Sequence, residues 1–406
     1  MRILFADKLD QKTVDDLTAH GHECVLEPTL TPDDLPGRIG GVEVLVVRST
    51  KVPRVVFEAA DRLVLVIRAG AGTNTIDCEA ASERGVFVCN VPGRNAAAVA
   101  ELTMGLLLAI DRRIVDNTVD LREGRWNKAS YGKAEGVLGA TMGIIGFGSI
   151  GQLVAERAAA FGIHVQTVAR AGASARVQRR ADELGVHLCE SLDDVLATSD
   201  IVSLHVPGRP ENKGLVDAAF LAKMRPGAIL LNTARGDVVD EPALLAALDA
   251  GRIRAGLDVY AGEPGSGTGA FESTLARHPA VIGTHHIGAS TNQAQRAIAQ
   301  GVTELVDAFM AGEPRHCVNL APERFGSFAL TVRHLDRVGV LAKILDRLSA
   351  EGLNVQHMEN QVFAGGEAAV AFIDIQGDPT EAVVAAIRAL PDVLGVSVVE
   401  LAQESA

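Results

Sequence analysis

The sequence has few cysteines, no excess of positive charge and no long hydrophobic run. The five cysteines are far apart and form no C-x-x-C pair, which argues against a disulfide framework or a zinc knuckle and is typical of a reducing compartment. The 38 basic against 51 acidic residues leave a net charge of −13, which disfavours binding to nucleic acid or to an anionic membrane. The most apolar stretch, Leu102–Ile110, is too short for a membrane span. Charge appears too early for a secretory signal, so we expect a soluble cytoplasmic protein without a metal site.

The length and the alternation of the sequence predict an α/β protein. At roughly 150 residues per domain, 406 residues make two or three domains. Short runs of Val, Ile and Leu alternate with helical stretches up to residue 91 and again from Met142, which is typical of parallel sheets covered by helices. The elements expected before the second series are strands over 2–7, 42–48, 63–68 and 86–91, one long helix over 95–118 and a polar loop over 122–133.

The last eighty residues have a different order. From about Gly326 the pattern predicts β, α, β, β, α and β elements, which is the ferredoxin-like order. We therefore predict two Rossmann- or flavodoxin-like, doubly wound parallel-sheet domains and a small C-terminal βαββαβ domain. The expected bounds are 1–95 for the first domain, to which the chain returns at 289–320, then 96–288 for the second and 326–406 for the third.

A glycine fingerprint follows the first strand of the second series. Gly146, Gly148 and Gly151 are spaced G-x-G-x-x-G between an expected strand and an expected helix. The first allows a tight turn, the second lets the backbone approach a pyrophosphate, and the third lets the helix pack closely on the sheet. The free N–H groups at the helix N-terminus favour the same anion. In this context the motif predicts a dinucleotide site.

The residue that selects the dinucleotide is absent from its usual place. An acid about 20 residues on holds the ribose 2′-OH of NAD, but here the next strand ends at Ala169-Arg170, with no acid before Asp182. An arginine there can pair with the 2′-phosphate of NADP, whereas a solvated loop arginine would leave NAD as the cofactor. We expect NAD or NADP, and Arg170 favours tolerance of NADP.

Three further residues could form a catalytic set. Arg235 follows an expected strand and suits bidentate binding of a carboxylate. His286 can exchange the proton that accompanies hydride transfer to a carbonyl, and Glu263 could orient its ring. Each could also be an ordinary loop charge. Together, at strand ends of a nucleotide-binding sheet, they lie where ligands bind in such folds.

In order and spacing, these blocks resemble the D-isomer-specific 2-hydroxyacid dehydrogenases, and within them the phosphoglycerate dehydrogenases with a single C-terminal ACT domain. The resemblance covers essentially the whole chain. The matching blocks are Arg48-Ser-Thr, Gly70-Ala-Gly-Thr-Asn-Thr-Ile-Asp77, Asn95, Ala100-Glu-Leu-Thr103, the glycine fingerprint, Ser203-Leu-His-Val-Pro207, Asn232-Thr-Ala-Arg-Gly236, Gly256-Leu-Asp-Val-Tyr-Ala-Gly-Glu-Pro264 and Thr284-His-His-Ile-Gly-Ala-Ser290.

The resemblance implies a set of site residues. The catalytic residues would be Arg235, Glu263 and His286. The cofactor residues would be Gly146, Gly148, Ser149, Ile150, Gly151, Ala169, Arg170, His205, Val206, Pro207, Thr233, Ala234, Asp258, His286 and Gly288. The substrate residues would be Arg48, Ser49, Ala71, Gly72, Asn95 and Arg235, and an arginine at position 48 suits a phosphate. Lys128 or Lys133 could add charge, also from a neighbouring subunit.

The resemblance also implies an activity. It is the oxidation of D-3-phosphoglycerate to 3-phosphohydroxypyruvate with NAD or NADP, the first step of phosphorylated L-serine biosynthesis. The substrate would be a small 2-hydroxy or 2-oxo acid, and the protein would be a homo-oligomer, a dimer or a tetramer. One alternative is a reductase of glyoxylate, hydroxypyruvate or 2-oxoglutarate. Another is a nucleotide-sensing binding protein on the same fold.

The sequence departs from the family pattern at several positions. His285 replaces the usual proline, so two adjacent histidines compete for the catalytic role, and the register with Ile287-Gly288 favours His286. The stretch 207–213 also differs from the usual sequence and could alter the edge of the pocket. In the C-terminal domain, His334 and Asn354 match serine-contacting positions, while Asp336 replaces asparagine and can only accept hydrogen bonds. The two alternatives are an L-serine effector site at these three residues and a domain that only holds subunits together.

Overall fold

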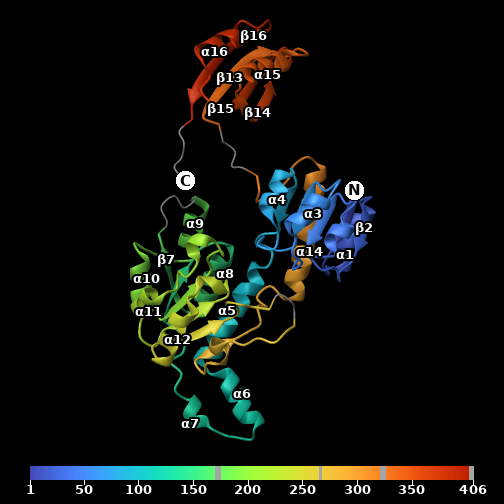
Figure 1. Ribbon diagram of the computed structural model, residues 1–406. Helices are drawn as coiled ribbons and strands as arrows, with labels where there is room; N and C mark the ends of the chain where they lie inside the picture. The colour runs from blue at the N-terminus through green and yellow to red at the C-terminus, as the bar shows by residue number, and fades with distance from the viewer. Residues whose placement is uncertain (170–174, 265–267, 321–325, 402–406) are drawn as a thin grey trace. The chain divides into compact units, whose positions relative to one another are not determined.

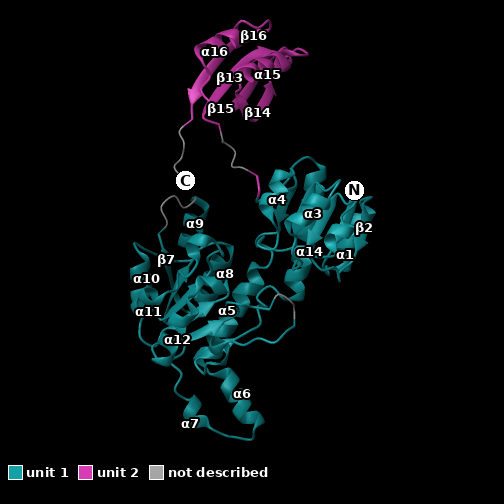
Figure 2. Cartoon of the chain, viewed as in Figure 1, with its two compact units in different colours: residues 1–318 teal, residues 319–406 magenta. Residues whose placement is uncertain are grey.

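The computed structural model describes residues 1–169, 175–264, 268–320 and 326–401. The chain divides into two compact units, residues 1–318 and 319–406 (Figure 2). Unit 1 contains two parallel sheets and unit 2 contains one antiparallel sheet (Figure 1). Within the described residues, no helix is long and apolar enough to cross a membrane. Among these described residues, there is also no group of three or more His, Cys, Asp or Glu side chains that could hold a metal ion.

The five-stranded sheet of unit 1 has the order β2-β1-β3-β4-β5, all parallel. Its strands are β1 (Arg2–Phe5), β2 (Glu23–Leu26), β3 (Val44–Val47), β4 (Leu65–Arg68) and β5 (Phe87–Asn90). One apolar core joins a face of this sheet to α1 (Gln11–Ala19) and α14 (Asn292–Met310). The other face packs on α2 (Leu35–Arg38), α3 (Arg54–Ala59) and α4 (Cys78–Glu83). The strand order reverses between β1 and β3, so a ligand is expected at their carboxyl ends.

The seven-stranded sheet has the order β12-β11-β10-β9-β6-β7-β8 and is also parallel. Its strands are β6 (Thr141–Ile145), β7 (His164–Val168), β8 (His187–Cys189), β9 (Ile201–Leu204), β10 (Ile229–Asn232), β11 (Arg254–Leu257) and β12 (Val281–Gly283). The helices on one face are α5 (Ala96–Asp111), α8 (Ser149–Ala160) and α9 (Ala175–Glu183). Those on the other are α10 (Leu192–Thr198), α11 (Ala218–Lys223), α12 (Glu241–Asp249) and α13 (Thr274–Arg277). Here the order reverses between β6 and β9, which is the dinucleotide position of a Rossmann sheet.

The single helix predicted over 95–118 is wrong. α5 ends at Asp111, Arg113 has a left-handed backbone (φ 49°), and a new helix, α6 (Ile114–Arg122), begins beyond it. The physical reason is burial, because α5 has a buried face whereas α6 has no buried residue. The loop predicted over 122–133 also contains a short helix, α7 (Lys128–Tyr131). The edge strand β2 was not predicted either, because none of its side chains is fully buried and its hydrophobic pattern is weak.

Unit 2 has the predicted βαββαβ order. Its elements are β13 (Phe328–Leu335), α15 (Val340–Ala350), β14 (Asn354–Val362), β15 (Ala368–Gln376), α16 (Glu381–Arg388) and β16 (Val393–Glu400). The strands form a sheet of order β14-β15-β13-β16. Leu330, Ile344, Ile373 and Ile387 belong to one buried core between the sheet and the two helices. The predicted α/β fold class, with two parallel sheets and a separate small one, is confirmed.

Candidate active site

The glycine fingerprint forms the turn between β6 and α8. Gly146 has φ +100°, and a Cβ there would lie 2.5 Å from the carbonyl oxygen of His205. A Cβ on Gly151 would lie 2.3 Å from the carbonyl oxygen of Gly146. Both positions therefore need glycine so that the turn can pack against β9 and the helix against the turn.

Gly148 differs from the other two glycines because a Cβ there would meet no atom within 4 Å. It is the N-cap of α8 and supplies no side-chain cap, so the first N–H groups of the helix, beginning at Ser149 and Ile150, have no side-chain acceptor from the cap residue. An open surface beside uncapped N–H groups is what a pyrophosphate requires. The geometry fits a dinucleotide.

The other predicted cofactor residues lie at the carboxyl ends of neighbouring strands. Ala169 follows β7 and is exposed, Val206 and Pro207 follow β9, and Thr233 and Ala234 follow β10. Arg170 lies outside the described residues. The predicted cofactor residues that the structure describes therefore line one edge of the seven-stranded sheet.

His205 is a half-buried residue at this edge. Its Nε2 lies 2.9 Å from Ser203 Oγ, and its Nδ1 is buried without a hydrogen-bond partner among the described residues. Burial lowers the pKa of His205 to about 3. The ring is therefore neutral at physiological pH, and Nδ1 is an unsatisfied polar atom at the edge that faces the fingerprint turn.

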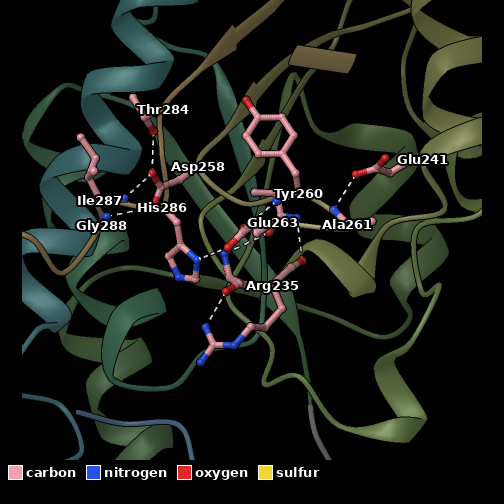
Figure 3. Close-up of polar contacts among 12 residues, drawn as sticks. Arg235, Glu241, Asp258, Tyr260, Ala261, Glu263, Thr284, His286, Ile287 and Gly288 are labelled. Carbon is pink, nitrogen blue, oxygen red and sulfur yellow. Dashed lines mark hydrogen bonds and ion pairs between the residues drawn. The ribbon is translucent and has the colours of Figure 1, made fainter. Parts of the chain in front are cut away.

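His286 and Glu263 form a hydrogen-bonded pair (Figure 3). Nδ1 of His286 lies 2.6 Å from Oε2 of Glu263, and Oε1 of the same carboxylate accepts the N–H of Tyr260 at 2.8 Å. Burial opposes ionisation of Glu263, but the hydrogen bonds from His286 and Tyr260 outweigh it and lower its pKa. The His286 side chain is 50% exposed and Glu263 only 29%, so the carboxylate supports the ring from the protein side. His285 is exposed and is not the histidine that pairs with Glu263.

Asp258 holds the loop that carries His286. It is 1% exposed, and its carboxylate accepts hydrogen bonds from Thr284 Oγ1 at 2.6 Å and from the N–H groups of Ile287 and Gly288 at 2.8 and 2.9 Å. Its backbone oxygen accepts the N–H of His286 at 2.7 Å. These four bonds hold His286 in a left-handed backbone conformation (φ 51°), which is unfavourable for a residue with a Cβ.

Arg235 lies between β10 and the short 3₁₀ helix η2 (Gly236–Val238). Its Nη1 donates to the carbonyl oxygen of Ala234 at 2.6 Å. A Cβ on Gly72 would lie 2.9 Å from Arg235 Nη2, so the arginine reaches from the seven-stranded sheet to the loop after β4. The structure therefore brings together Arg235 and Gly72, which the sequence assigned to the substrate.

Glu241 is a residue of the site that sequence reasoning missed. From the first turn of α12 its Oε1 accepts the N–H of Ala261 at 2.7 Å (Figure 3). It therefore ties the loop between Tyr260 and Glu263 to the segment that follows Arg235. In the sequence, Glu241 is an acidic residue at the start of a helix. Its favourable interaction with the helix dipole is enough to explain such a residue, so it gave no reason to expect a role in the site.

Arg48 and Arg68 lie at the carboxyl edge of the five-stranded sheet, and the charge of Arg235 also acts on Arg68. Asp7 Oδ2, just after β1, accepts the N–H groups of Arg48, Ser49 and Thr50 at 2.7 to 3.1 Å. Arg68, at the end of β4, was missed. Burial, then the positive charges of Arg235 and Arg48, lower the pKa of Arg68 to about 10.

The Arg68 guanidinium lies over Gly70, where a Cβ would come 1.7 Å from Nη1. Its Nε is buried without a hydrogen-bond partner among the described residues. An arginine at a strand end beside glycine was visible in the sequence. Its position beside Arg48 depends on the strand order, which the sequence does not reveal.

The structure also shows the surroundings of Ala71 and Asn95, two of the predicted substrate residues. The Nδ2 of Asn90, at the end of β5, donates to the carbonyl oxygen of Ala71 at 2.6 Å. Asn95 is the N-cap of α5 and makes no side-chain cap hydrogen bond. Arg48 also lines a small cavity of about 10 Å³ with Lys8 and Gln295.

The predicted effector residues do not converge within one chain. His334 is 1% exposed, and its Nε2 lies 3.0 Å from Asn360 Oδ1. Asn354 is paired with Gln376 in β14–β15, at the end of the sheet where β13 begins, whereas His334 lies near the end where β13 finishes. Six residues of strand separate the two ends, about 20 Å. Asp336 is exposed in the loop after His334.

Several known proteins are similar to this chain in sequence or in structure. Residues 104–288 match the family model described as the D-isomer specific 2-hydroxyacid dehydrogenase, NAD binding domain. Two curated relatives are a D-3-phosphoglycerate dehydrogenase of Mycobacterium leprae, 42% identical over 77% of this chain and 57% of the relative, and a hydroxypyruvate reductase of Thermotoga maritima, 40% identical over 75% of this chain and 97% of the relative. The chain therefore spans a little over half of the first relative's length. A crystal structure of a Thermus thermophilus protein aligns with TM-score 0.69 at 34% identity, covering 78% of this chain and all of that one.

Proposed function

The chain belongs to the D-isomer specific 2-hydroxyacid dehydrogenase family, and on that basis we propose that it oxidises D-3-phosphoglycerate to 3-phosphohydroxypyruvate with NAD. The observation that carries the choice of substrate is the cluster of Arg48, Arg68 and Arg235, where the half-buried Arg68 has a buried Nε without a hydrogen-bond partner among the described residues. A substrate with a carboxylate at one end and a phosphate at the other would supply the missing negative charges.

The dinucleotide would lie along the edge of the seven-stranded sheet. Its pyrophosphate would be held by the N–H groups at the start of α8, next to Gly148. When bound, the nicotinamide would accept the hydride removed from C2 of the hydroxy acid.

His286 would act as the general base. Because Nδ1 faces the Glu263 carboxylate at 2.6 Å, it carries the proton, and Nε2 is left to accept the proton of the substrate's C2 hydroxyl. The Glu263 carboxylate then stabilises the imidazolium that forms. Arg235 would hold the substrate carboxylate, and its reach to Gly72 would bring that carboxylate to the loop of Ala71 and Gly72.

The phosphate would occupy the space between Arg48 and Arg68. Arg48→Ala should therefore raise KM for D-3-phosphoglycerate by about 100-fold, but KM for D-glycerate by less than about threefold, because only the first substrate places a dianion there. An equal loss for both substrates would overturn the phosphate assignment.

A second candidate function is reduction of hydroxypyruvate. It is favoured by the name of the Thermotoga maritima relative, 97% of which is aligned with this chain. One panel of initial rates separates the two: D-3-phosphoglycerate, D-glycerate and 2-hydroxyglutarate in oxidation, and hydroxypyruvate and glyoxylate in reduction. We expect the highest kcat/KM for the phosphorylated substrate. A higher value for the hydroxypyruvate–glycerate couple would favour the second candidate.

The same panel should be run with NAD and NADP, and with and without L-serine. The described chain places no acid directly after β7, where Ala169 is exposed, so we propose that NADP is tolerated. L-serine feedback stays a prediction, and within one chain His334 and Asn354 do not form a common site.

We further propose a homo-oligomer and a division of labour within unit 1. The five-stranded sheet, with α14 on its face, would bind the substrate, and the seven-stranded sheet would bind the cofactor. The arm formed by α6 and α7 projects from the rest of unit 1 (Figure 1) and exposes Ile114, Val119, Leu121 and Trp126. A second copy of the chain would cover these side chains. Light scattering should give at least twice the 42.6 kDa of one chain, and Leu121→Glu should reduce the mass to that of a monomer.

A further inference from the structure

Two cysteines that the proposed reaction does not use lie side by side at the edge of the five-stranded sheet. Cys89 is in β5, the edge strand, and Cys317 is near the end of unit 1. Their Sγ atoms are 2.9 Å apart although 228 positions separate them in the chain. Both are free thiols.

The backbone brings the two residues into direct opposition. Cys317 forms an antiparallel bridge with Cys89. The N–H of Asn90 donates to the oxygen of His316, and the N–H of Val318 donates to the oxygen of Val88. These bonds flank the pair, so Cys89 and Cys317 occupy a non-hydrogen-bonded position of an antiparallel ladder, where the Cα atoms are about 4.5 Å apart. That separation lies within the range that a disulfide spans, about 4.4–6.8 Å.

The two thiols differ in their surroundings. Cys89 is 2% exposed, and burial, followed by the hydrogen bond with Cys317, raises its pKa. Cys317 is only half-buried. An oxidant from solution would therefore reach Cys317 first, and Cys89 would be the buried partner that resolves the product.

We propose that Cys89 and Cys317 form a redox modification site that reacts with a small-molecule disulfide such as oxidised glutathione. The Cys317 thiolate attacks one sulfur of the disulfide, so that a mixed disulfide forms and one thiolate leaves. The Cys89 thiolate then attacks Cys317 Sγ, and the second thiolate leaves as the Cys89–Cys317 bond forms. Each thiolate takes up one of the two protons that the cysteines release. The two cysteines are oxidised by two electrons, and the small disulfide is reduced to two thiols.

The site lies next to residues placed near the substrate. Asn90 follows Cys89 directly and holds the carbonyl oxygen of Ala71, and the N–H of Val91 bonds to Gly70. The disulfide would fix the segment 316–318 on the edge of β5. Because it closes a loop of more than 200 residues, it should stabilise unit 1 substantially against unfolding.

The test uses the full chain equilibrated in glutathione buffers of increasing oxidised fraction, then acid-quenched and alkylated. We expect loss of two alkylatable thiols, a single crosslinked peptide pair containing Cys89 and Cys317, and reversal by dithiothreitol. The Tm of unit 1 should rise by about 5 °C on oxidation.

Two variants make the test decisive. Cys317→Ser should leave Cys89 alkylatable and abolish both the crosslink and the Tm shift. Cys24→Ser changes a half-buried cysteine in β2, at the opposite edge of the same sheet, and should behave like the unmodified chain. The proposal fails if both thiols stay free in the most oxidising buffer, or if glutathione stays attached to Cys317 while Cys89 remains alkylatable.

Discussion

The carboxyl edges of the two sheets in unit 1 both contain an acid held by backbone N–H groups, Asp258 and Asp7, but they differ in their other charged side chains. At the seven-stranded sheet the acids are satisfied by protein groups, since Asp258 accepts three hydrogen bonds through its carboxylate and Glu263 accepts two. At the five-stranded sheet Arg68 is half-buried, and its buried Nε has no hydrogen-bond partner among the described residues, while the charges of Arg48 and Arg235 repel it. One edge is organised before any ligand arrives, and the other keeps its positive charge for the ligand.

This difference separates chemistry from recognition. A base must be held at a fixed position before the reaction, and a network of hydrogen bonds supplies that position. An anion site needs positive charges that are held close together and shielded from water. Repulsion between these charges destabilises the folded protein when no anion is bound. We call the carboxyl edge of the seven-stranded sheet the first edge and that of the five-stranded sheet the second edge. Substitutions at the first edge should lower kcat and leave KM nearly unchanged. Substitutions at the second edge should raise KM and stabilise the protein when no ligand is bound.

The largest effect is expected at the first edge, for His286→Ala. Loss of the base should lower kcat by about 1,000-fold, while the Kd of the dinucleotide and the Tm change little. The neighbouring exposed histidine provides the control, and His285→Ala should keep kcat within about twofold. Pre-steady-state and steady-state rates of both variants measure this directly. Comparable losses in the two variants would show that Glu263 does not select the catalytic histidine.

At the second edge, Arg68→Gln should raise KM for D-3-phosphoglycerate by about 100-fold, because an arginine–phosphate contact is removed. Without ligand the same variant should be more stable than the wild type by about 1 kcal/mol, because a half-buried cation that other arginines repel is gone. Urea unfolding measures the second effect. A variant that loses both affinity and stability would contradict the contrast between the two edges.

The pH dependence of this stability gain has a definite sign. The pKa of Arg68 is lowered from 12.5 to about 10, so the unfolded chain binds this proton more tightly than the folded chain does. The cost of the charge is therefore fully present below about pH 10 and disappears as the pH rises towards 12.5. The difference in urea midpoint between Arg68→Gln and wild type should therefore be constant below about pH 10 and shrink as the pH rises from about 10 towards 12.5.

Glu263→Gln tests the pairing at the first edge with a smaller change. The amide oxygen can still accept the Nδ1 proton of His286, so the ring can keep its orientation. The amide nitrogen then faces the N–H of Tyr260, so that hydrogen bond is lost together with the negative charge. We expect kcat/KM to fall by about 30-fold, because the imidazolium that forms at His286 loses its negative partner. The pKa of Glu263 is lowered, so its contribution to stability is present above about pH 4.5 and is lost as the pH falls further. An unchanged kcat/KM would exclude an electrostatic role for this carboxylate.

Much of the first edge could be predicted from sequence, because its chemistry lies in short motifs. The fingerprint glycines stand at a strand–helix turn, and Arg235, Glu263 and His286 each follow a strand, so a parallel sheet brings them to one edge. The roles of Asp258 as the anchor of the histidine loop and of Glu241 as the anchor of the glutamate loop could not be predicted. Both depend on hydrogen bonds to backbone N–H groups, which have no residue signature.

The second edge was harder to predict because its residues come together only through strand order. Arg48 and Arg68 are neighbours because β3 pairs with β4, and nothing within either segment reveals that pairing. The break between α5 and α6 had no glycine or proline to mark it, and only the loss of burial beyond Asp111 explains it. Within one chain the predicted effector residues lie apart for a related reason: a strand of nine residues places Asn354 far from the end of the sheet at which His334 lies.

The smallest effect is expected for Glu241, which would act on the reacting groups only indirectly, through the loop that carries Glu263. Its carboxylate accepts the N–H of Ala261, and the N–H of the preceding residue, Tyr260, donates to Glu263. Glu241→Ala should loosen the glutamate loop and lower kcat by about fivefold, with KM within about twofold. Glu241→Gln should restore kcat, because its amide oxygen accepts the same N–H. If the two variants have equal kcat, the hydrogen bond to Ala261 does not position Glu263, and the organisation of the first edge would depend on Asp258 and Tyr260 alone.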